Sequence, residues 1–344
     1  MLPNQSPGVG VSDAAASGST HDASILEAIR NCLLAEMERD ERVLVLGMDV
    51  AQLGGVFRAT HGLLSRFGPN RVVDTPMSEG AIVGASLGLA IGGMLPIAEI
   101  QFLGFTHQAF HQIGFQLGRY RFRSRGRYHA QVTIRAPFGG GIRTPEFHPD
   151  SIEAQFTQTP GIQVVCPAFP ADAKGLLLSA IRNPDPVMFL EPQRIYRSVR
   201  GPVPDGEYTV PFGVSRLVRT GTDITLIAWS AAVHLCLQAA DRLAEEGISA
   251  SVLDLRSLIP LDVEGLVDAV TACGKAVVVQ EAPFTGGFGA EIVATLQQEA
   301  FMSLDAPILR VAAHDTPYPP GGLEDYYLPS VDRVLAAARA TVAF

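Results

Sequence analysis

A surplus of positive charge is missing from this chain. Lys and Arg number 26 against 35 Asp and Glu, which gives a formal net charge of −9 over 344 residues. Nonspecific nucleic-acid binding needs basic side chains that displace counterions from phosphates, so the composition argues against that class of function. The acidic balance suits a basic protein partner instead.

Cysteine and export signals are scarce too. No CxxC pair occurs, and the few thiols lie in apolar contexts, which predicts buried free thiols in a reducing compartment. They are Cys32, Cys166, Cys236 and Cys273. Residues 1–23 lack an apolar core and a basic start and are rich in small residues. We therefore predict a flexible tail there, no signal peptide, and a cytoplasmic location.

Charge is absent altogether between Glu79 and Glu99. An uncharged run of this length is close to that of a membrane span. Pro96 near its end and the lack of a basic flank argue against that interpretation. We interpret the run as a buried helix that begins after Pro76 and Ser78.

Glycine recurs at every fourth position of this predicted helix, at Gly80, Gly84, Gly88 and Gly92. These positions share one face, and each glycine costs roughly 1 kcal/mol relative to alanine. A close helix crossing at a subunit interface would explain that cost. Glu79 is then either a desolvated carboxyl group that handles a proton or the N-terminal charge of an ordinary core helix.

The rest of the chain alternates between short apolar runs and helical stretches. Strands are predicted at 43–46, 71–73, 96–100, 131–135, 162–166 and 187–190, and again at 224–229, 250–255, 276–280 and 308–311. Helices are predicted between them, including 24–39, 105–119 and 171–181. This alternation predicts an α/β protein of two doubly wound domains with mainly parallel sheets. We place the domains at 24–200 and 214–344, with a linker at 201–213 that is rich in Gly and Pro.

Ligands of open α/β sheets bind beyond the carboxyl ends of the strands. Glu79, the segment 99–102 and the glycine-rich loop 137–141 are expected at that edge. His148 follows the loop and is either an acid/base group or a surface residue.

His107 and His111 stand one helical turn apart, a spacing that metal ligands use. No third ligand is evident, so two polar residues on a helix face is the favoured interpretation. No dinucleotide fingerprint opens any strand-to-helix turn, which argues against a nucleotide or flavin module.

Several motifs occur in a fixed order along almost the whole chain. They are DTPMSE at 74–79, EIQF at 99–102, DAKGLL at 172–177, LEP at 190–192, LDLRSL at 253–258, EAPFTGGFG at 281–289 and DTPYP at 315–319. Together they resemble the beta chain of the thiamin-diphosphate-dependent decarboxylating component of 2-oxo acid dehydrogenase complexes. The resemblance covers residue 24 to the C-terminus.

The resemblance implies a transketolase-like pyrimidine-binding domain followed by a transketolase C-terminal domain. It also implies an α2β2 heterotetramer with an alpha chain, and a C-terminal domain that docks the basic module of a lipoyl acyltransferase core. The activity implied is oxidative decarboxylation of a 2-oxo acid, with acyl transfer to lipoamide. The motif that binds Mg²⁺ and diphosphate, GDG followed by asparagine, is absent here. The alpha chain would therefore supply that half of the cofactor site, and this chain alone should be inactive.

Site residues are carried over by the same resemblance. Glu79 takes the place of the glutamate that hydrogen-bonds the aminopyrimidine ring nitrogen, and Phe105 that of the aromatic packed on this ring. Gln101 is expected in the same wall, and His148 takes the place of the histidine that assists acyl transfer. A structural K⁺ ion is implied at Ala130, Val132, Thr133, Ala180, Asn183 and Asp185.

Some positions depart from the family pattern, and others help to distinguish its subfamilies. Gly104 and His111 stand where aspartates are usual, and Pro149-Asp150 replaces Ser-Gln. Between subfamilies, IYR at 195–197, AW at 228–229 and EAPFTGGF at 281–288 favour branched-chain enzymes. A pyruvate or acetoin dehydrogenase, or a noncatalytic scaffold subunit, remains the alternative.

Overall fold

The N-terminal boundary of the fold carries a strand that the sequence did not predict. The computed structural model describes residues 19–344, so most of the expected tail lies outside the described residues. Within the predicted tail and linker, β1 (Thr20–Ser24) pairs antiparallel with β8 (Arg200–Pro204). Ala23 and Val203 are buried against Ala28, so this pairing closes a small apolar cluster over the first helix.

The N-terminal domain is built on a sheet of seven strands in the order β12-β6-β7-β5-β4-β2-β3. All neighbours pair in parallel except β12, which runs antiparallel to β6. The strands are β2 (Val43–Gly47), β3 (Val72–Asp74), β4 (Leu95–Glu99), β5 (Thr133–Phe138), β6 (Gln163–Val165), β7 (Val187–Pro192) and β12 (Ser257–Ile259).

Alternate strand residues face opposite layers of helices. Val43 and Val45 of β2 pack with α1 (Ile25–Arg39) and α6 (Pro170–Arg182), whereas Leu44 and Leu46 face α3 (Glu79–Ile91). The domain also contains two short helices, α2 (Leu63–Phe67) and α5 (Glu153–Thr157). The first helix begins where the sequence predicts, because Ser24 and Glu27 form a capping box.

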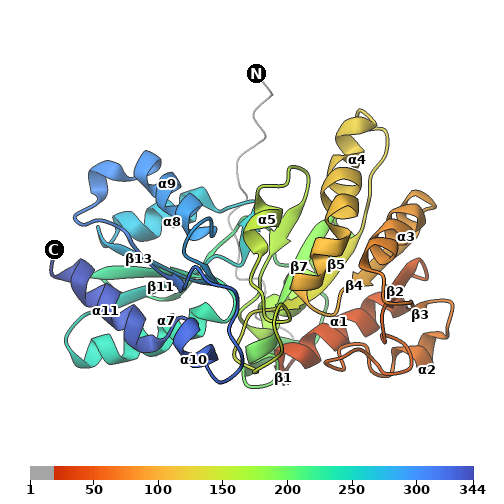
Figure 1. The fold of residues 1–344 in the computed structure, drawn as a ribbon, viewed down its shortest axis with the longest axis horizontal. Coiled ribbons are helices and arrows are strands. Elements are labelled where there is room, and N and C mark those ends of the chain that lie inside the picture. Colours follow the sequence, from red (N-terminus) through yellow and green to blue (C-terminus); the bar gives the residue numbers. More distant parts are fainter. Residues whose placement is uncertain (1–18) are drawn as a thin grey trace.

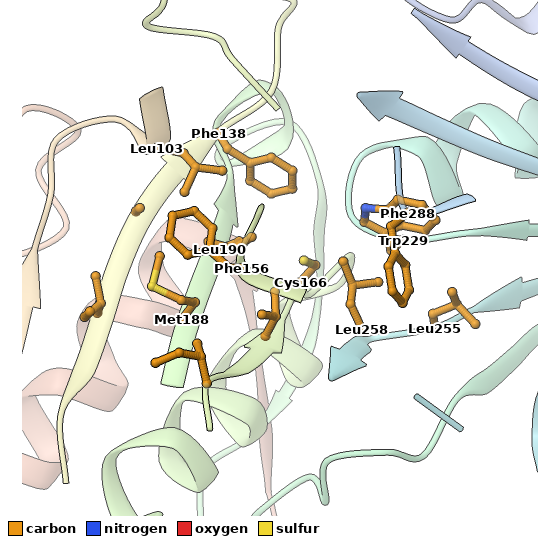
Figure 2. Packing of buried hydrophobic residues seen from close by; sticks show 14 of the residues in the cluster. Leu103, Phe138, Phe156, Cys166, Met188, Leu190, Trp229, Leu255, Leu258 and Phe288 are labelled. Atoms are coloured by element: carbon orange, nitrogen blue, oxygen red, sulfur yellow. The ribbon is translucent and has the colours of Figure 1, made fainter. Parts of the chain in front are cut away.

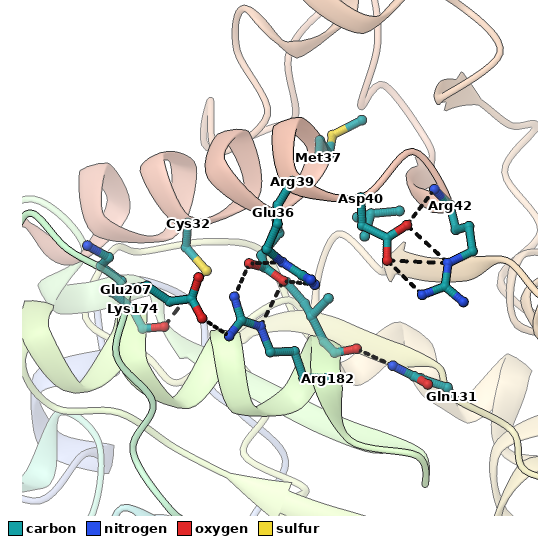
Figure 3. Close-up of polar contacts among 12 residues, drawn as sticks. Cys32, Glu36, Met37, Arg39, Asp40, Arg42, Gln131, Lys174, Arg182 and Glu207 are labelled. Atoms are coloured by element: carbon teal, nitrogen blue, oxygen red, sulfur yellow. Dashed lines mark hydrogen bonds and ion pairs between the residues drawn. The ribbon is translucent and has the colours of Figure 1, made fainter.

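A buried carboxylate joins α1 to α6. Glu36 accepts hydrogen bonds from Arg39 and Arg182, and Arg182 also contacts Glu207 (Figure 3). Burial raises the pKa of Glu36, but the two guanidinium groups outweigh that effect and the pKa is lowered. Glu36 is therefore ionised and holds the two helices together.

The C-terminal domain has a sheet of five strands in the order β14-β13-β10-β11-β9, parallel except for β9. The strands are β9 (Arg216–Arg219), β10 (Ile224–Ala228), β11 (Ala250–Asp254), β13 (Ala276–Pro283) and β14 (Leu309–Ala313). The helices are α7 (Ala232–Glu245), α8 (Val263–Thr271), α9 (Gly289–Glu299), α10 (Glu324–Tyr327) and α11 (Val331–Val342). Figure 1 shows the two domains side by side, with α5 between them. The predicted α/β fold with mainly parallel sheets is confirmed.

One hydrophobic cluster runs through both domains. Phe138 and Phe156 of the first domain belong to the same buried cluster as Trp229 and Phe288 of the second (Figure 2). Because β12 lies after the linker in sequence yet pairs with β6, the second half of the chain also contributes a strand to the first sheet. The two domains therefore fold against each other as one packed unit.

The helix predicted at 105–119 is not a single α-helix. It is divided into a 3₁₀ segment η1 (Leu103–Ala109), a π segment η2 (His111–Leu117) and α4 (Gly118–Arg123). Gly118 lies so close to the Pro160 carbonyl that a Cβ there would sit 2.9 Å from it. This approach to a neighbouring loop is tertiary and is not visible in helical periodicity. The remaining 3₁₀ turns are η3 (Gln193–Ile195) and η4 (Phe301–Ser303).

The helix predicted to be buried, α3, is buried on one face only. Ile82 and Val83 pack on the sheet, whereas Gly84, Ala85 and Gly88 are exposed. No helix within residues 19–344 is long and apolar enough to cross a membrane. The predicted burial of three of the four cysteines is confirmed, and all four thiols are free, with Cys273 half-buried.

Candidate functional site

The register of the first sheet brings the predicted site segments to one edge. Gly47 of β2 pairs with both Asp74 and Glu99, and Glu99 pairs with Arg135. The segments that continue to Glu79, Gln101 and Gly139 therefore all leave the sheet at its carboxyl edge.

Glu79 is the first residue of α3 and is only 6% exposed. Its Oε2 atom is buried and has no hydrogen-bond partner among residues 19–344. A buried carboxylate oxygen without a partner is costly, and a ligand that donates a hydrogen bond would satisfy it. The site thus fits an aminopyrimidine or a similar nitrogen donor.

Four aromatic rings gather beside this edge. His148 lies 4.6 Å from Phe102 and 5.0 Å from Phe105, measured between ring centroids, and Phe147 stacks on His148 at 5.3 Å. The Nδ1 atom of His148 lies 3.0 Å from the Glu146 carbonyl oxygen. If Nδ1 carries the proton, Nε2 is left free to exchange one with a ligand. The structure therefore brings His148 and Phe105 together.

Gly104 is matched to the loop that carries His148. A Cβ at position 104 would collide with the Phe147 carbonyl oxygen, so an aspartate there is incompatible with this loop. Phe147 itself has a positive φ of 55°, and Pro149 beyond it is buried. The departures at 104 and 149–150 thus belong to one local arrangement.

Gln101 is buried, and its amide is already engaged. Its Nε2 donates to Asp49 Oδ2 at 3.1 Å, and Asp49 adopts a positive φ of 62°. The amide therefore holds the loop after β2 in place. His107 and His111, by contrast, are both exposed, and no group of three or more metal-ligating side chains occurs within residues 19–344.

A buried charge cluster behind this edge was missed by sequence reasoning. Arg135 is 1% exposed and donates to Glu99 at 2.6 Å and to Glu191 at 2.7 and 3.0 Å, while Tyr196 donates to Glu191. Burial raises the pKa of Glu99, Arg135 opposes this, and Glu191 adds to it. The only signal in the sequence is an arginine inside an apolar strand, Ile134-Arg135-Ala136.

The positions proposed for K⁺ lie where β5 begins and α6 ends. The Val132 carbonyl accepts from Val187 N–H, and the Ala180 carbonyl from Asn183 N–H. Asp185 pairs with Arg121 at 2.5 Å, so its carboxylate already has a cationic partner. Ala130 and Thr133 are buried on either side of Val132. The two segments are adjacent, and carbonyl oxygens are the ligands that suit K⁺. The K⁺ site stays a prediction.

Both halves of the chain match known domain families. Residues 21–199 match the family described as transketolase, pyrimidine binding domain, and residues 213–334 match transketolase, C-terminal domain. The chain is 49% identical over 321 residues to the pyruvate dehydrogenase E1 component subunit beta of Bacillus subtilis, covering 93% of this chain and 99% of that one. The protein of the same name from Staphylococcus epidermidis is 48% identical over the same coverage.

A solved structure shares the fold. A chain of a split-gene transketolase, described as an inactive beta4 tetramer, aligns with a TM-score of 0.75 at 24% identity and covers 93% of this chain. At this identity the likeness concerns the fold alone.

Proposed function

Because the chain belongs to the family of beta subunits of 2-oxo acid dehydrogenase decarboxylating components, we propose that it forms half of a thiamin-diphosphate site. In this role it catalyses, with an alpha chain, the oxidative decarboxylation of a 2-oxo acid and transfer of the acyl group to lipoamide. The observation that carries this proposal is the unpartnered Oε2 of Glu79 at the carboxyl edge of the sheet.

Thiamin diphosphate, when bound, supplies the electron sink for decarboxylation. The chain's own residues would orient it: Glu79 would share a proton with the aminopyrimidine ring nitrogen in a hydrogen bond, and Phe105 would pack on the ring. His148, with one nitrogen on the Glu146 carbonyl and the other free, would move a proton during acyl transfer. The aromatic side chains of Phe102 and Phe147 contact that imidazole and would orient it.

The alpha chain is proposed as the second half of the site. On the exposed face of α3, the small residues Ala81, Ala85 and Gly88 are open to solvent within residues 19–344. A helix of an alpha chain can approach such a face closely, which supports an α2β2 assembly. The absence of a GDG motif supports placing Mg²⁺ and the diphosphate on that partner. The lipoyl acyltransferase core and a cytoplasmic location remain proposals from the family resemblance.

The substrate we propose first is pyruvate, because relatives at 48–49% identity over 93% of the chain carry that name. The branched-chain assignment predicted from IYR at 195–197, AW at 228–229 and EAPFTGGF at 281–288 stays as the second candidate. In the structure Tyr196 and Trp229 are both buried and hydrogen-bond to carboxylates, Tyr196 to Glu191 and Trp229 to Glu153. These motif residues therefore have structural partners, which weakens their value as markers of substrate.

Co-expression with a candidate alpha chain tests the proposal. Decarboxylation of pyruvate and of 2-oxoisovalerate would be measured with and without thiamin diphosphate, with this chain alone as the baseline. We expect activity only with both chains and the cofactor, and a higher kcat/KM for pyruvate. A higher kcat/KM for 2-oxoisovalerate would establish the second candidate, and no activity with any 2-oxo acid would contradict the function.

A further inference from the structure

The glycine-rich loop at 139–141 lies in a clamp formed largely by the C-terminal domain. A Cβ on Gly139 would collide with Glu281, and one on Gly140 with the hydroxyl of Tyr318. The Gly140 N–H donates to Glu281 at 3.1 Å, and Gln193 donates to the Gly139 carbonyl. A Cβ on Gly141 would likewise collide with the Arg194 side chain. The three glycines are thus explained by close contact with protein rather than by a phosphate.

Glu324 is the centre of this clamp. It begins α10, is 1% exposed, and accepts hydrogen bonds from Gly141 N–H at 2.9 Å and from Arg143 N–H at 3.2 and 3.3 Å. The Tyr318 hydroxyl donates to the same carboxylate at 2.6 Å. Hydrogen bonds to an ionised acceptor are stronger than neutral ones, so three donors on one buried carboxylate fix the main chain firmly.

The segment held in this way leads directly to His148. Arg143 has a positive φ of 57°, and the chain then runs to Phe147, whose carbonyl oxygen lies against Gly104. The loop is therefore fixed at its start by Glu324 and at its end by Gly104. His148 directly follows this second point, and its ring lies against Phe102 and Phe105.

We propose that Glu324 is a positioning residue for acyl transfer: its carboxylate, on the C-terminal domain, fixes Gly141 and Arg143 and so sets the place of the His148 imidazole. This inference rests on the proposed function. It predicts that decarboxylation and acyl transfer respond differently to a change in the clamp, because Glu79 lies on α3 and is not part of the clamp. Loosening the clamp should impair acyl transfer far more than decarboxylation.

The test compares Glu324→Gln with Asp325→Asn in the complex reconstituted with the alpha chain. Asp325 is the adjacent residue and makes only an exposed contact with the Arg143 side chain, so it is the matched control. Decarboxylation is measured with ferricyanide as electron acceptor, and acyl transfer with an isolated lipoyl domain. We expect Glu324→Gln to lower the ratio of acyl transfer to decarboxylation at least tenfold, and Asp325→Asn to leave it unchanged.

Hydrogen exchange of the peptide covering residues 139–148 gives a second measurement that needs no bound cofactor. Glu324→Gln should exchange at least tenfold faster there than the parent chain, whereas Asp325→Asn should not. If Glu324→Gln fails to fold, Tyr318→Phe is used instead, because it removes one of the three donors and keeps the carboxylate. It should lower the ratio of acyl transfer to decarboxylation and speed exchange at 139–148, each by less than is expected for Glu324→Gln.

The two hypotheses fail separately in this design. An active parent complex with an unchanged ratio in Glu324→Gln, or unchanged exchange at 139–148, would overturn the role of Glu324 alone. A parent complex that decarboxylates no 2-oxo acid would contradict the proposed function, while faster exchange would still support the clamp.

Discussion

Arg135 neutralises two carboxylates that would otherwise be buried without a counter-charge. Replacing it with methionine keeps most of the volume but leaves Glu99 and Glu191 unpaired behind the site edge. Removing one member of such a cluster costs about 3–5 kcal/mol. We expect Arg135→Met to lower the free energy of unfolding by that amount in urea denaturation.

Arg242→Met is the control for this prediction, because Arg242 pairs with Asp332 on the surface. An exposed pair contributes at most about 1 kcal/mol. A loss below about 1 kcal/mol in Arg135→Met as well would show that the buried cluster is not a stabilising unit.

The residues of the site differ in how well the sequence alone predicts them. Glu79 and His148 stand out because each is a polar residue next to an apolar run or a glycine-rich loop. Arg135 does not, because its partners are distant in sequence and meet it only through the pairing of β4, β5 and β7. Glu324 is hidden for the same reason, since its main-chain partners Gly141 and Arg143 lie in another domain.

At the scale of elements, the contact between α5 and the C-terminal domain contains two buried acids. Glu153 on α5 accepts from Trp229 Nε1 at 3.3 Å, and Glu281 on β13 accepts from Gly140. Burial raises the pKa of each to about 7. The charge of Glu281 raises the pKa of Glu153 further. The pKa of Glu281 is lowered by Arg194 and raised by Glu324.

The stability of the molecule should therefore depend on pH between 4.5 and 8. A raised pKa means that the folded state holds its proton longer than the unfolded chain, so stability falls as pH rises from 4.5 through about 7. Glu153→Gln keeps an oxygen for Trp229 and removes the ionisation, a gain on the order of 3 kcal/mol for a shift of this size. We expect a higher Tm than the parent at pH 8 and a similar Tm at pH 5.

Glu291→Gln, an exposed carboxylate on α9, should leave the pH profile of Tm unchanged and serves as the control. A Glu153→Gln variant whose Tm follows that of the parent at both pH values would contradict the proposed titration.

Elements with uninterrupted apolar runs were predictable, and β2, β4 and β7 begin within one residue of the predicted positions. The broken helix from Leu103 to Arg123 was not, because helical periodicity does not report tertiary contacts such as that of Gly118 with the Pro160 carbonyl. The pairing of β1 with β8 and of β12 with β6 joins segments far apart in sequence, which periodicity does not report.

At the scale of the whole molecule, the two domains share a hydrophobic cluster and one clamp on the glycine-rich loop. The predicted cofactor site lies at the carboxyl edge of the first sheet, where α3 has an exposed face. The account therefore makes the alpha chain a requirement for activity and Glu79 a requirement within this chain.

The most direct measurement is the decarboxylation rate of the reconstituted complex carrying Glu79→Gln. Glu264→Gln is the matched control, because Glu264 also lies in the first turn of a helix but is exposed. The account predicts a loss of roughly two or more orders of magnitude for Glu79→Gln, the scale expected for an essential acid/base group, and no change for Glu264→Gln. A Glu79→Gln complex with the rate of the parent would contradict it.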